Sequence, residues 1–216
     1  GYVSHELRSP MTRLQMALGL AQQESTAKPA REQYLQRCEL EVARLNQMIE
    51  DALVLSRLEN TLQTIKKEPL NLTALIQKII NEEQFIANEK SIKIEFDSIA
   101  TVELLGDSNL LFSAISNVIT NSVKYSPEHS TVKVSLSIKE LLVSLVISDN
   151  GTGVPSQSLT ELFTPFYRVS LARDRKTGGT GLGLAIAKQA INAHQGKIFA
   201  KNNEIQGLSV TIQLPL

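Results

Sequence analysis

The apolar residues near the start of the chain recur every three or four positions, which is the period of an amphipathic helix. Between residues 3 and 23 they are Val3, Leu7, Leu14, Ala17 and Ala21. At about 100° per residue these positions form one stripe, and His5 lies about 200° from Val3. The pattern therefore predicts a helix with His5 on the solvent side. Pro10 removes one backbone hydrogen bond and predicts a bend just past His5.

A second helix is predicted over residues 30–60, after a polar turn at residues 24–29. Its seam alternates steps of three and four through Leu35, Cys38, Val42, Leu45, Ile49, Ala52 and Ser56. A hairpin of two such helices has too little core to be stable alone, so we expect two copies to pair as a four-helix bundle. The sequence therefore predicts a homodimer.

Beyond residue 62 the hydrophobic period changes. Strand-like runs occupy residues 92–96, 132–138, 141–148, 197–201 and 208–214, and helical patterns occupy residues 72–88, 108–125 and 182–194. Only residues 139–140 separate two of the strand-like runs, which predicts an antiparallel hairpin. The predicted class is α+β, with a helical hairpin over residues 1–62 and an α/β sandwich over residues 63–216 that has helices on one face of a mixed sheet.

Charge and composition narrow the functional classes. Lys plus Arg and Asp plus Glu number 22 each, and this balance argues against nucleic acid as a partner. The single cysteine, Cys38, predicts a small buried residue in a reducing compartment. The chain has neither a membrane-spanning apolar run nor a signal-peptide pattern, so we expect no membrane contact by these residues. Its start inside a helix, without methionine, suggests part of a longer protein.

A carboxylate and two glycines follow directly on one predicted strand, as Asp149, Gly151 and Gly153. The carboxylate can accept a hydrogen bond from an exocyclic amine, and the glycines let the backbone turn close to a ligand. Alone, this pattern is equally well read as an ordinary turn. A second glycine-rich run, residues 178–184, leads into an apolar helix and favours a phosphate site, with a flexible loop as the alternative.

The helix predicted over residues 108–125 presents Asn117 and Asn121 one turn apart, followed by Lys124 and Tyr125. Amide oxygens suit a hydrated Mg²⁺ ion, and a lysine suits phosphate oxygens. Taken alone, a solvated polar face is the better interpretation of these residues.

Taken together, the motifs resemble those of the bacterial sensor histidine kinases. They follow the family order: an H box at residues 5–10, an N box ending at 121–125, a first glycine box at 149–153, an F box at 163–168 and a second glycine box at 179–183. The resemblance covers nearly the whole chain. It implies a protein-histidine kinase core with a GHKL-type ATPase domain.

The resemblance also implies a role for each motif. His5 would receive the γ-phosphoryl group of ATP, Glu6 would take the ring proton, and Arg168 would neutralise the transferring phosphate. Asp149 would accept the adenine amine, and Asn121 would ligate Mg²⁺. The other expected nucleotide-binding residues are Asn117, Lys124, Tyr125, Gly151, Gly153, Gly179, Thr180, Gly181, Leu182 and Gly183. Residues 170–178 would form a mobile lid.

The implied partner is the receiver domain of a response regulator, and the implied full-length protein is anchored in the inner membrane with this part on the cytoplasmic face. Ser9 stands four residues after His5, where dual-function members usually carry Thr or Asn. Its hydroxyl keeps donor and acceptor capacity, so a phosphatase activity is expected as well. The alternatives are another GHKL-fold ATPase and a kinase-inactive, dimeric nucleotide-binding scaffold.

Overall fold

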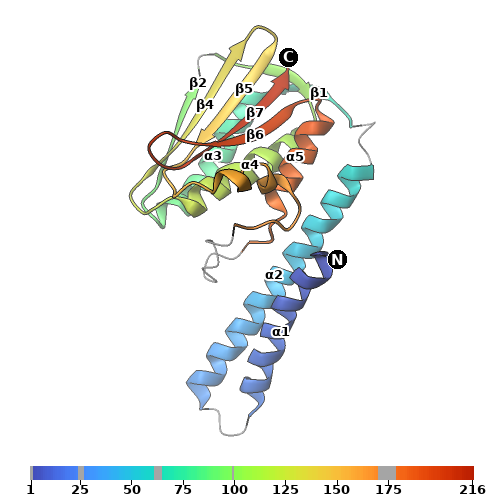
Figure 1. Ribbon diagram of the computed structural model, residues 1–216, viewed down its shortest axis with the longest axis vertical. Coiled ribbons are helices and arrows are strands. Elements are labelled where there is room, and N and C mark those ends of the chain that lie inside the picture. Colours follow the sequence, from blue (N-terminus) through green and yellow to red (C-terminus); the bar gives the residue numbers. More distant parts are fainter. Residues whose placement is uncertain (1, 24–26, 61–64, 99, 170–178) are drawn as a thin grey trace.

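The computed structural model describes residues 2–23, 27–60, 65–98, 100–169 and 179–216, and their side chains except those of residues 2–7, 59 and 60. Figure 1 shows a long helical hairpin that extends from a layered α/β unit in which helices cover one side of a sheet. The predicted fold class is thus confirmed. Among the described helices, none has the length and apolar character needed to cross a membrane.

The hairpin consists of α1 (Tyr2–Gln22) and α2 (Lys28–Asn60), which pack against each other. α1 contains Pro10 and remains one helix on both sides of it. α2 begins earlier than predicted, and Pro29 falls in its first turn. Backbone N–H groups in the first turn of a helix make no intrahelical hydrogen bond, so a proline, which has no N–H, is tolerated there. The predicted end of α2 is confirmed. The proposed domain boundary at residue 62 falls within 61–64, outside the described residues.

The predicted seam of α2 is divided between two faces of the helix. The face toward the rest of the chain holds the half-buried Cys38, Leu45 and Ala52 and the buried Glu41, Met48 and Leu55. Leu35, Val42 and Ile49 are instead 45%, 44% and 50% exposed. A helix that packs against neighbours on two sides has apolar residues on both faces. In the sequence these residues merge into one series of three- and four-residue steps, which does not show which residue faces which neighbour.

The larger sheet has the strand order β2-β4-β5-β7-β6. Its strands are β2 (Lys93–Ser98), β4 (Thr131–Lys139), β5 (Leu142–Ser148), β6 (Lys197–Asn202) and β7 (Leu208–Pro215). β2 and β4 are parallel and the other pairs are antiparallel, so the predicted mixed sheet is confirmed.

Three helices cover one face of this sheet: α3 (Leu72–Asn88), α4 (Ser108–Tyr125) and α5 (Gly183–Ala193). The bounds of α3 and α4 match the prediction. Alternate residues of β4 and β5 point toward the helices and are buried, as period-2 burial requires. They join the apolar faces of the three helices in the main core of the molecule.

The sequence did not predict a second, two-stranded sheet, formed by β1 (Glu68–Asn71) and β3 (Glu103–Gly106). These strands are short and show no sustained apolar alternation, so nothing in their local pattern distinguishes them from loops. Two short 3₁₀ turns, Ser156–Ser158 and Glu161–Phe163, lie between β5 and α5.

The predicted hairpin between β4 and β5 is confirmed, but its turn is displaced by one residue. Lys139 pairs with Leu142, which leaves Glu140 and Leu141 as the loop. Glu140 adopts a φ of 58°, so the change of chain direction occurs there rather than at Lys139.

The helical hairpin meets the α/β unit along α2 and α5. We call this contact the interdomain cluster, and its buried members are Met48, Leu55, Leu58, Phe166, Leu182, Ala185 and Ile186. Met48, Leu55 and Leu58 come from α2, and the others come from the region of the F box, the second glycine run and α5. The start of α5 is therefore packed against α2 (Figure 1).

Candidate active site

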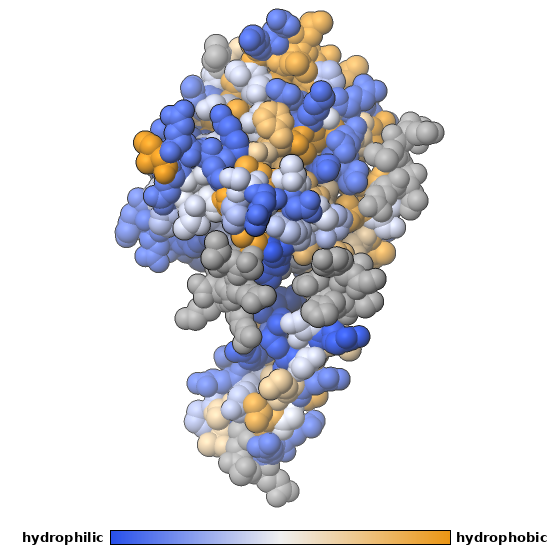
Figure 2. Space-filling view, in the orientation of Figure 1, coloured by the Kyte–Doolittle hydropathy of each residue, from blue (hydrophilic) through white to orange (hydrophobic). Residues whose placement is uncertain are grey.

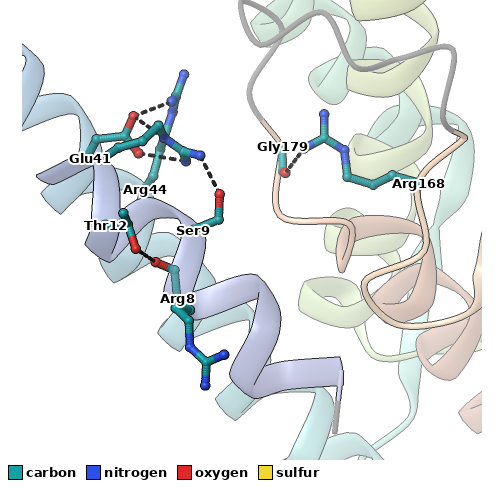
Figure 3. Close-up of polar contacts among 8 residues, drawn as sticks. Arg8, Ser9, Thr12, Glu41, Arg44, Arg168 and Gly179 are labelled. Atoms are coloured by element: carbon teal, nitrogen blue, oxygen red, sulfur yellow. Dashed lines mark hydrogen bonds and ion pairs between the residues drawn. The ribbon is translucent and has the colours of Figure 1, made fainter. Parts of the chain in front are cut away.

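The H-box residues lie at the start of α1. The backbone of His5 and Glu6 is helical, whereas their side chains are outside the described set, so the predicted exposure of His5 remains a prediction. Ser9 lies one turn further along, exposed, and its Oγ accepts a hydrogen bond from Arg13 Nη1 at 2.6 Å. Close by, Thr12 donates its hydroxyl to the carbonyl of Arg8 at 2.9 Å (Figure 3).

The two asparagines of α4 are both half-buried and lie one turn apart. Asn117 Nδ2 donates to the carbonyl of Ser113 at 2.9 Å, which fixes the direction of the amide. Its Oδ1 faces the first residue of α5, because a Cβ placed on Gly183 would lie 2.4 Å from that oxygen. A side chain at position 183 would therefore displace the Asn117 amide, where α5 begins beside α4.

The end of α4 meets the second glycine run. A Cβ on Gly179 would lie 2.5 Å from Lys124 Nζ, so the backbone of the run and the lysine are in direct proximity. Lys124 Nζ also lies 5.3 Å from the centre of the Tyr125 ring. Burial, together with the positive charges of Arg168, Lys90 and Arg44, lowers the pKa of Lys124 to about 8.

Asp149 follows directly on β5 and is buried. Its Oδ1 accepts the backbone N–H groups of Gly151 at 2.8 Å and of Leu208 at 3.0 Å. Burial raises the pKa of the carboxyl group, and these two N–H donors act in the opposite direction. Both hydrogen bonds from the described residues end on Oδ1, which leaves Oδ2 as the oxygen that can accept from a ligand.

Loop contacts position Asp149 beside the end of α4. A Cβ on Gly151 would lie 2.7 Å from the carbonyl oxygen of Tyr125, so the first glycine run passes directly over the C-terminal end of that helix. Gly153 has a φ of 68°, a conformation that glycine adopts without strain.

Two asparagines that sequence reasoning did not single out hold this loop. Asn202 donates Nδ2 to the carbonyl of Val154 at 2.7 Å, and its Oδ1 accepts the Val154 N–H at 2.9 Å. Asn203 Nδ2 donates to the carbonyl of Asp149 at 3.0 Å. The signal for this pair was its position at the end of a predicted strand, where side chains that bond to backbone are common.

The F box and the second glycine run are joined through their backbones. The N–H of Phe166 donates to the carbonyl of Gly181 at 2.8 Å, and both residues have positive φ, 64° and 71°. Arg168 is exposed and donates Nη1 to the carbonyl of Gly179 at 3.4 Å (Figure 3). The expected lid at 170–178 lies outside the described residues.

Two expected nucleotide-binding residues are engaged by α2. Thr180 donates its hydroxyl to Asp51 Oδ2 at 2.7 Å, and its Oγ1 accepts the N–H of Leu182 at 3.2 Å. Leu182 is fully buried in the interdomain cluster. The structure thus brings the N box, both glycine runs and Arg168 together at one end of the α/β unit, and it places Thr180 and Leu182 on the side that contacts the hairpin.

Comparisons with known proteins match both parts of the chain. Residues 106–216 match the family described as histidine kinase-, DNA gyrase B-, and HSP90-like ATPase, and residues 1–61 match the His Kinase A (phospho-acceptor) domain. The sensor histidine kinase CpxA of Escherichia coli strain K12 is 36% identical over 216 residues, which are 99% of this chain and 46% of CpxA. The chain therefore spans about half the length of that relative.

Solved structures resemble the chain over nearly its full length. The full-length ShkA in complex with AMPPNP has a TM-score of 0.73 and 25% identity, over 99% of this chain and 44% of that one. The histidine kinase ThkA in complex with the response regulator protein TrrA has a TM-score of 0.80 and 19% identity, over 99% and 59%, and this likeness shows the fold alone.

Proposed function

We propose that this chain is the core of a protein-histidine kinase. The chain belongs to the histidine kinase-, DNA gyrase B-, and HSP90-like ATPase family, and it joins that domain to a His Kinase A domain. In the reaction, ATP phosphorylates His5. The observation that carries the proposal is the convergence of the N box, both glycine runs and Arg168 around the end of α4.

Asp149 is the residue that selects the base in this proposal. Its Oδ1 is held by two backbone N–H groups, so Oδ2 is directed toward the ligand and can accept the exocyclic amine of adenine. The AMPPNP complex of ShkA supports an adenine nucleotide as the ligand of this fold. Tyr125, 45% exposed, lies at the edge of the site and can pack against the base.

The phosphates would lie between the end of α4 and the start of α5. Lys124 supplies a positive charge beside Gly179, and the N-terminus of α5 supplies backbone N–H groups near Gly181 and Gly183. Bare glycine backbone at these positions lets phosphate oxygens approach the N–H donors. On the side of the base, Gly151 and Gly153 let the loop after Asp149 pass close to Tyr125 and Asn202.

Asn121 suits the proposed Mg²⁺ ion through its amide oxygen. In the described ranges, no group of three or more His, Cys, Asp or Glu side chains is placed to hold a metal ion, so one amide, the nucleotide phosphates and water would supply the ligands. When bound, Mg²⁺ would neutralise charge on the phosphate oxygens. Asn117 lies one turn earlier, and its Oδ1 faces Gly183 at the start of α5.

In the transfer step, a ring nitrogen of His5 forms the new bond to the γ-phosphorus, and the bond from that phosphorus to the bridging oxygen of ADP breaks. The ring proton passes to Glu6, which neighbours His5 in the chain. Arg168 is exposed beside Gly179, where its charge can stabilise the transferring group. We propose that the nucleotide domain moves relative to α2 so that the two sites meet. Pro10, inside α1, is one expected point of bending. The other expected joint, residues 60–68, includes residues 61–64, which lie outside the described residues.

The exposed apolar residues of the hairpin support a homodimer. Leu35, Val42 and Ile49 repeat along α2, and Met11 and Leu18 repeat along α1, with exposed fractions of 43–50%. Figure 2 shows apolar side chains among the polar surface of the hairpin. Pairing of these stripes from two copies would bury them in a four-helix bundle.

The proposed partner is the receiver domain of a response regulator, to which the phosphoryl group passes from His5. Residues 1–61 match a phospho-acceptor domain, which supports a phosphoryl group on this part of the chain. ThkA, which has the same fold, is in complex with the response regulator protein TrrA. Ser9, exposed one turn after His5, would orient water for removal of the phosphoryl group from the regulator. For the whole protein we propose a membrane anchor, with this core on the cytoplasmic face of the inner membrane.

Incubation of the chain with γ-labelled Mg-ATP tests the kinase proposal. We expect acid-labile, alkali-stable label on His5, with His5→Gln as the blank. ATP hydrolysis without label on His5 would instead support a GHKL-fold ATPase. Nucleotide binding with neither hydrolysis nor label would support a kinase-inactive scaffold.

A further inference from the structure

A buried carboxylate connects the two helices of the hairpin beside the H box. Glu41 on α2 is 1% exposed. Its Oε1 accepts Arg13 Nε at 3.0 Å and its Oε2 accepts Arg13 Nη2 at 2.9 Å, so the guanidinium of α1 is held at two points. Arg44 Nη1 also donates to Oε1, at 2.9 Å (Figure 3).

This geometry fixes the plane and the position of the Arg13 guanidinium. Burial by itself would raise the pKa of Glu41, but the hydrogen bond and charge of Arg13 and the charge of Arg44 outweigh it and hold the pKa below its ordinary value. Glu41 therefore stays ionised at neutral pH. A two-point contact of this kind needs the planar fork of arginine, because a lysine ammonium has no fixed plane.

The remaining end of the fork reaches Ser9. Arg13 Nη1 donates to Ser9 Oγ at 2.6 Å, one helical turn back along α1. A serine hydroxyl normally rotates to suit its surroundings, and in a helix it often bonds to the preceding turn, as Thr12 does with the carbonyl of Arg8. The Arg13 donor occupies one lone pair of Ser9, so the hydroxyl proton and the second lone pair point away from Arg13.

Ser9 is therefore a hydroxyl with a set orientation on the turn after His5. Its position one turn along the helix places it on about the same face as the histidine. Glu41 is anchored in α2, so the orientation of Ser9 depends on the packing of both helices rather than on α1 alone.

We propose that Arg13 is a positioning residue for the phosphatase step, holding the Ser9 hydroxyl toward the water that attacks the acyl phosphate of a docked regulator. This inference rests on the proposed function. The water oxygen forms the new bond to phosphorus and the bond from phosphorus to the aspartyl oxygen breaks. The aspartate leaves as a carboxylate, and both water protons end on inorganic phosphate. Arg13 gains and loses no proton.

The test compares four proteins: the unaltered chain, Arg13→Lys, Ser9→Ala and the double variant. The substrate is a receiver domain that the unaltered chain phosphorylates, loaded with acetyl phosphate, and the readout is the release of inorganic phosphate at saturating receiver. Arg13→Lys keeps the charge and loses the fork. Arg31→Lys, an exposed arginine at the other end of the hairpin, is the matched control and should release phosphate at the unaltered rate.

If Arg13 acts through Ser9, Arg13→Lys lowers the maximal rate about 10-fold when Ser9 is present. The same substitution in the Ser9→Ala background then lowers it less than about 2-fold. An equal loss in both backgrounds would show that Arg13 only braces the two helices, and no loss in either would also overturn the proposal. A chain that phosphorylates His5 but removes no phosphate from the receiver would refute the role of Arg13 and leave the kinase proposal standing. Absence of label on His5 would refute the kinase itself.

Discussion

Thr180 donates its hydroxyl to Asp51 Oδ2 at 2.7 Å, so the second glycine run is hydrogen-bonded to α2 across the boundary between the two parts of the chain. The same hydroxyl oxygen accepts the N–H of Leu182, which is buried against α2. A local change at Asp51 is therefore expected to reach the backbone at the start of α5.

Replacement of Asp51 with Ala removes the acceptor of this hydrogen bond. The contact between the second glycine run and α2 should lose about 1 kcal/mol of stabilisation, the net value of an ordinary hydrogen bond. The amide of Leu182 should then exchange with solvent deuterium about 5-fold faster, because the Thr180 hydroxyl loses its fixed position. Gln47→Ala is the control, since Gln47 donates to the other carboxylate oxygen, Oδ1, at 2.8 Å. Equal exchange at Leu182 in both variants would contradict the prediction.

The exposed face of α2 predicts the effect of a charge on assembly. Ile49→Asp places a carboxylate on the stripe proposed to pair between copies, so we expect a shift from dimer to monomer in light scattering at micromolar concentration. Leu40→Asp is the control, because Leu40 is exposed but lies about 180° around the helix from Ile49. If both variants remain dimeric, this stripe is not the dimer interface.

Asp149 predicts a specific loss of nucleotide affinity. In Asp149→Asn the amide oxygen can still accept the N–H groups of Gly151 and Leu208. The amide NH₂ then occupies the Oδ2 position and faces the exocyclic amine of adenine. Both groups are hydrogen-bond donors, so no hydrogen bond forms between them. We expect the dissociation constant for AMPPNP to rise about 100-fold, corresponding to roughly 3 kcal/mol for a lost hydrogen bond to a charged group. Titration calorimetry measures it, with the exposed Asp97→Asn as the control. Unchanged affinity would remove Asp149 from base recognition.

His194 predicts a loss of stability in mild acid. The imidazole is 2% exposed, its Nδ1 lies 2.7 Å from the carbonyl oxygen of Ala190, and its Nε2 accepts the N–H of Asp107 at 2.9 Å, an arrangement that requires the neutral ring. Burial lowers the pKa of His194, and the positive charge of Lys67 acts in the same direction, against the Ala190 bond and the Asp107 charge.

Because the unfolded chain binds a proton near pH 6.5 and the folded chain does so only at lower pH, the stabilising contribution is complete above pH 6.5 and is lost as the pH falls toward the folded value. Urea unfolding at several pH values should show this slope, and His194→Gln should flatten it. An identical slope in the variant would assign the acid sensitivity to other groups.

Regular elements with strong periods were predictable from the sequence. The bounds of α3 and α4 match the observed helices, and each helix has a side-chain cap, at Asn71 and Asp107. The resemblance to the sensor histidine kinases is confirmed by the comparison with CpxA. The short pair β1 and β3 was missed because its pairing is non-local and its strands carry no extended pattern.

Within the site, the motif residues on α4 and in the glycine runs were identified from the sequence, and the contacts that hold them were not. Asn202 and Glu41 act through partners far away in the chain, Val154 and Arg13. A hydrophobic pattern assigns both residues to the surface because they are polar. It does not show that Glu41 is a buried charge paired with arginines, or that the amide of Asn202 is hydrogen-bonded to a loop.

Because burial lowers the pKa of Lys124 to about 8, we expect the proposed nucleotide binding to be coupled to proton uptake. A bound polyphosphate would raise that pKa again, so at pH 8 the complex takes up a fraction of a proton from the buffer. Two calorimetric titrations in buffers of different ionisation enthalpy would then give different apparent heats, and affinity would decline as the pH rises above 8. In the proposed function, the half-buried lysine at the end of α4 would thereby link the energy of ATP capture to the proton concentration around the protein.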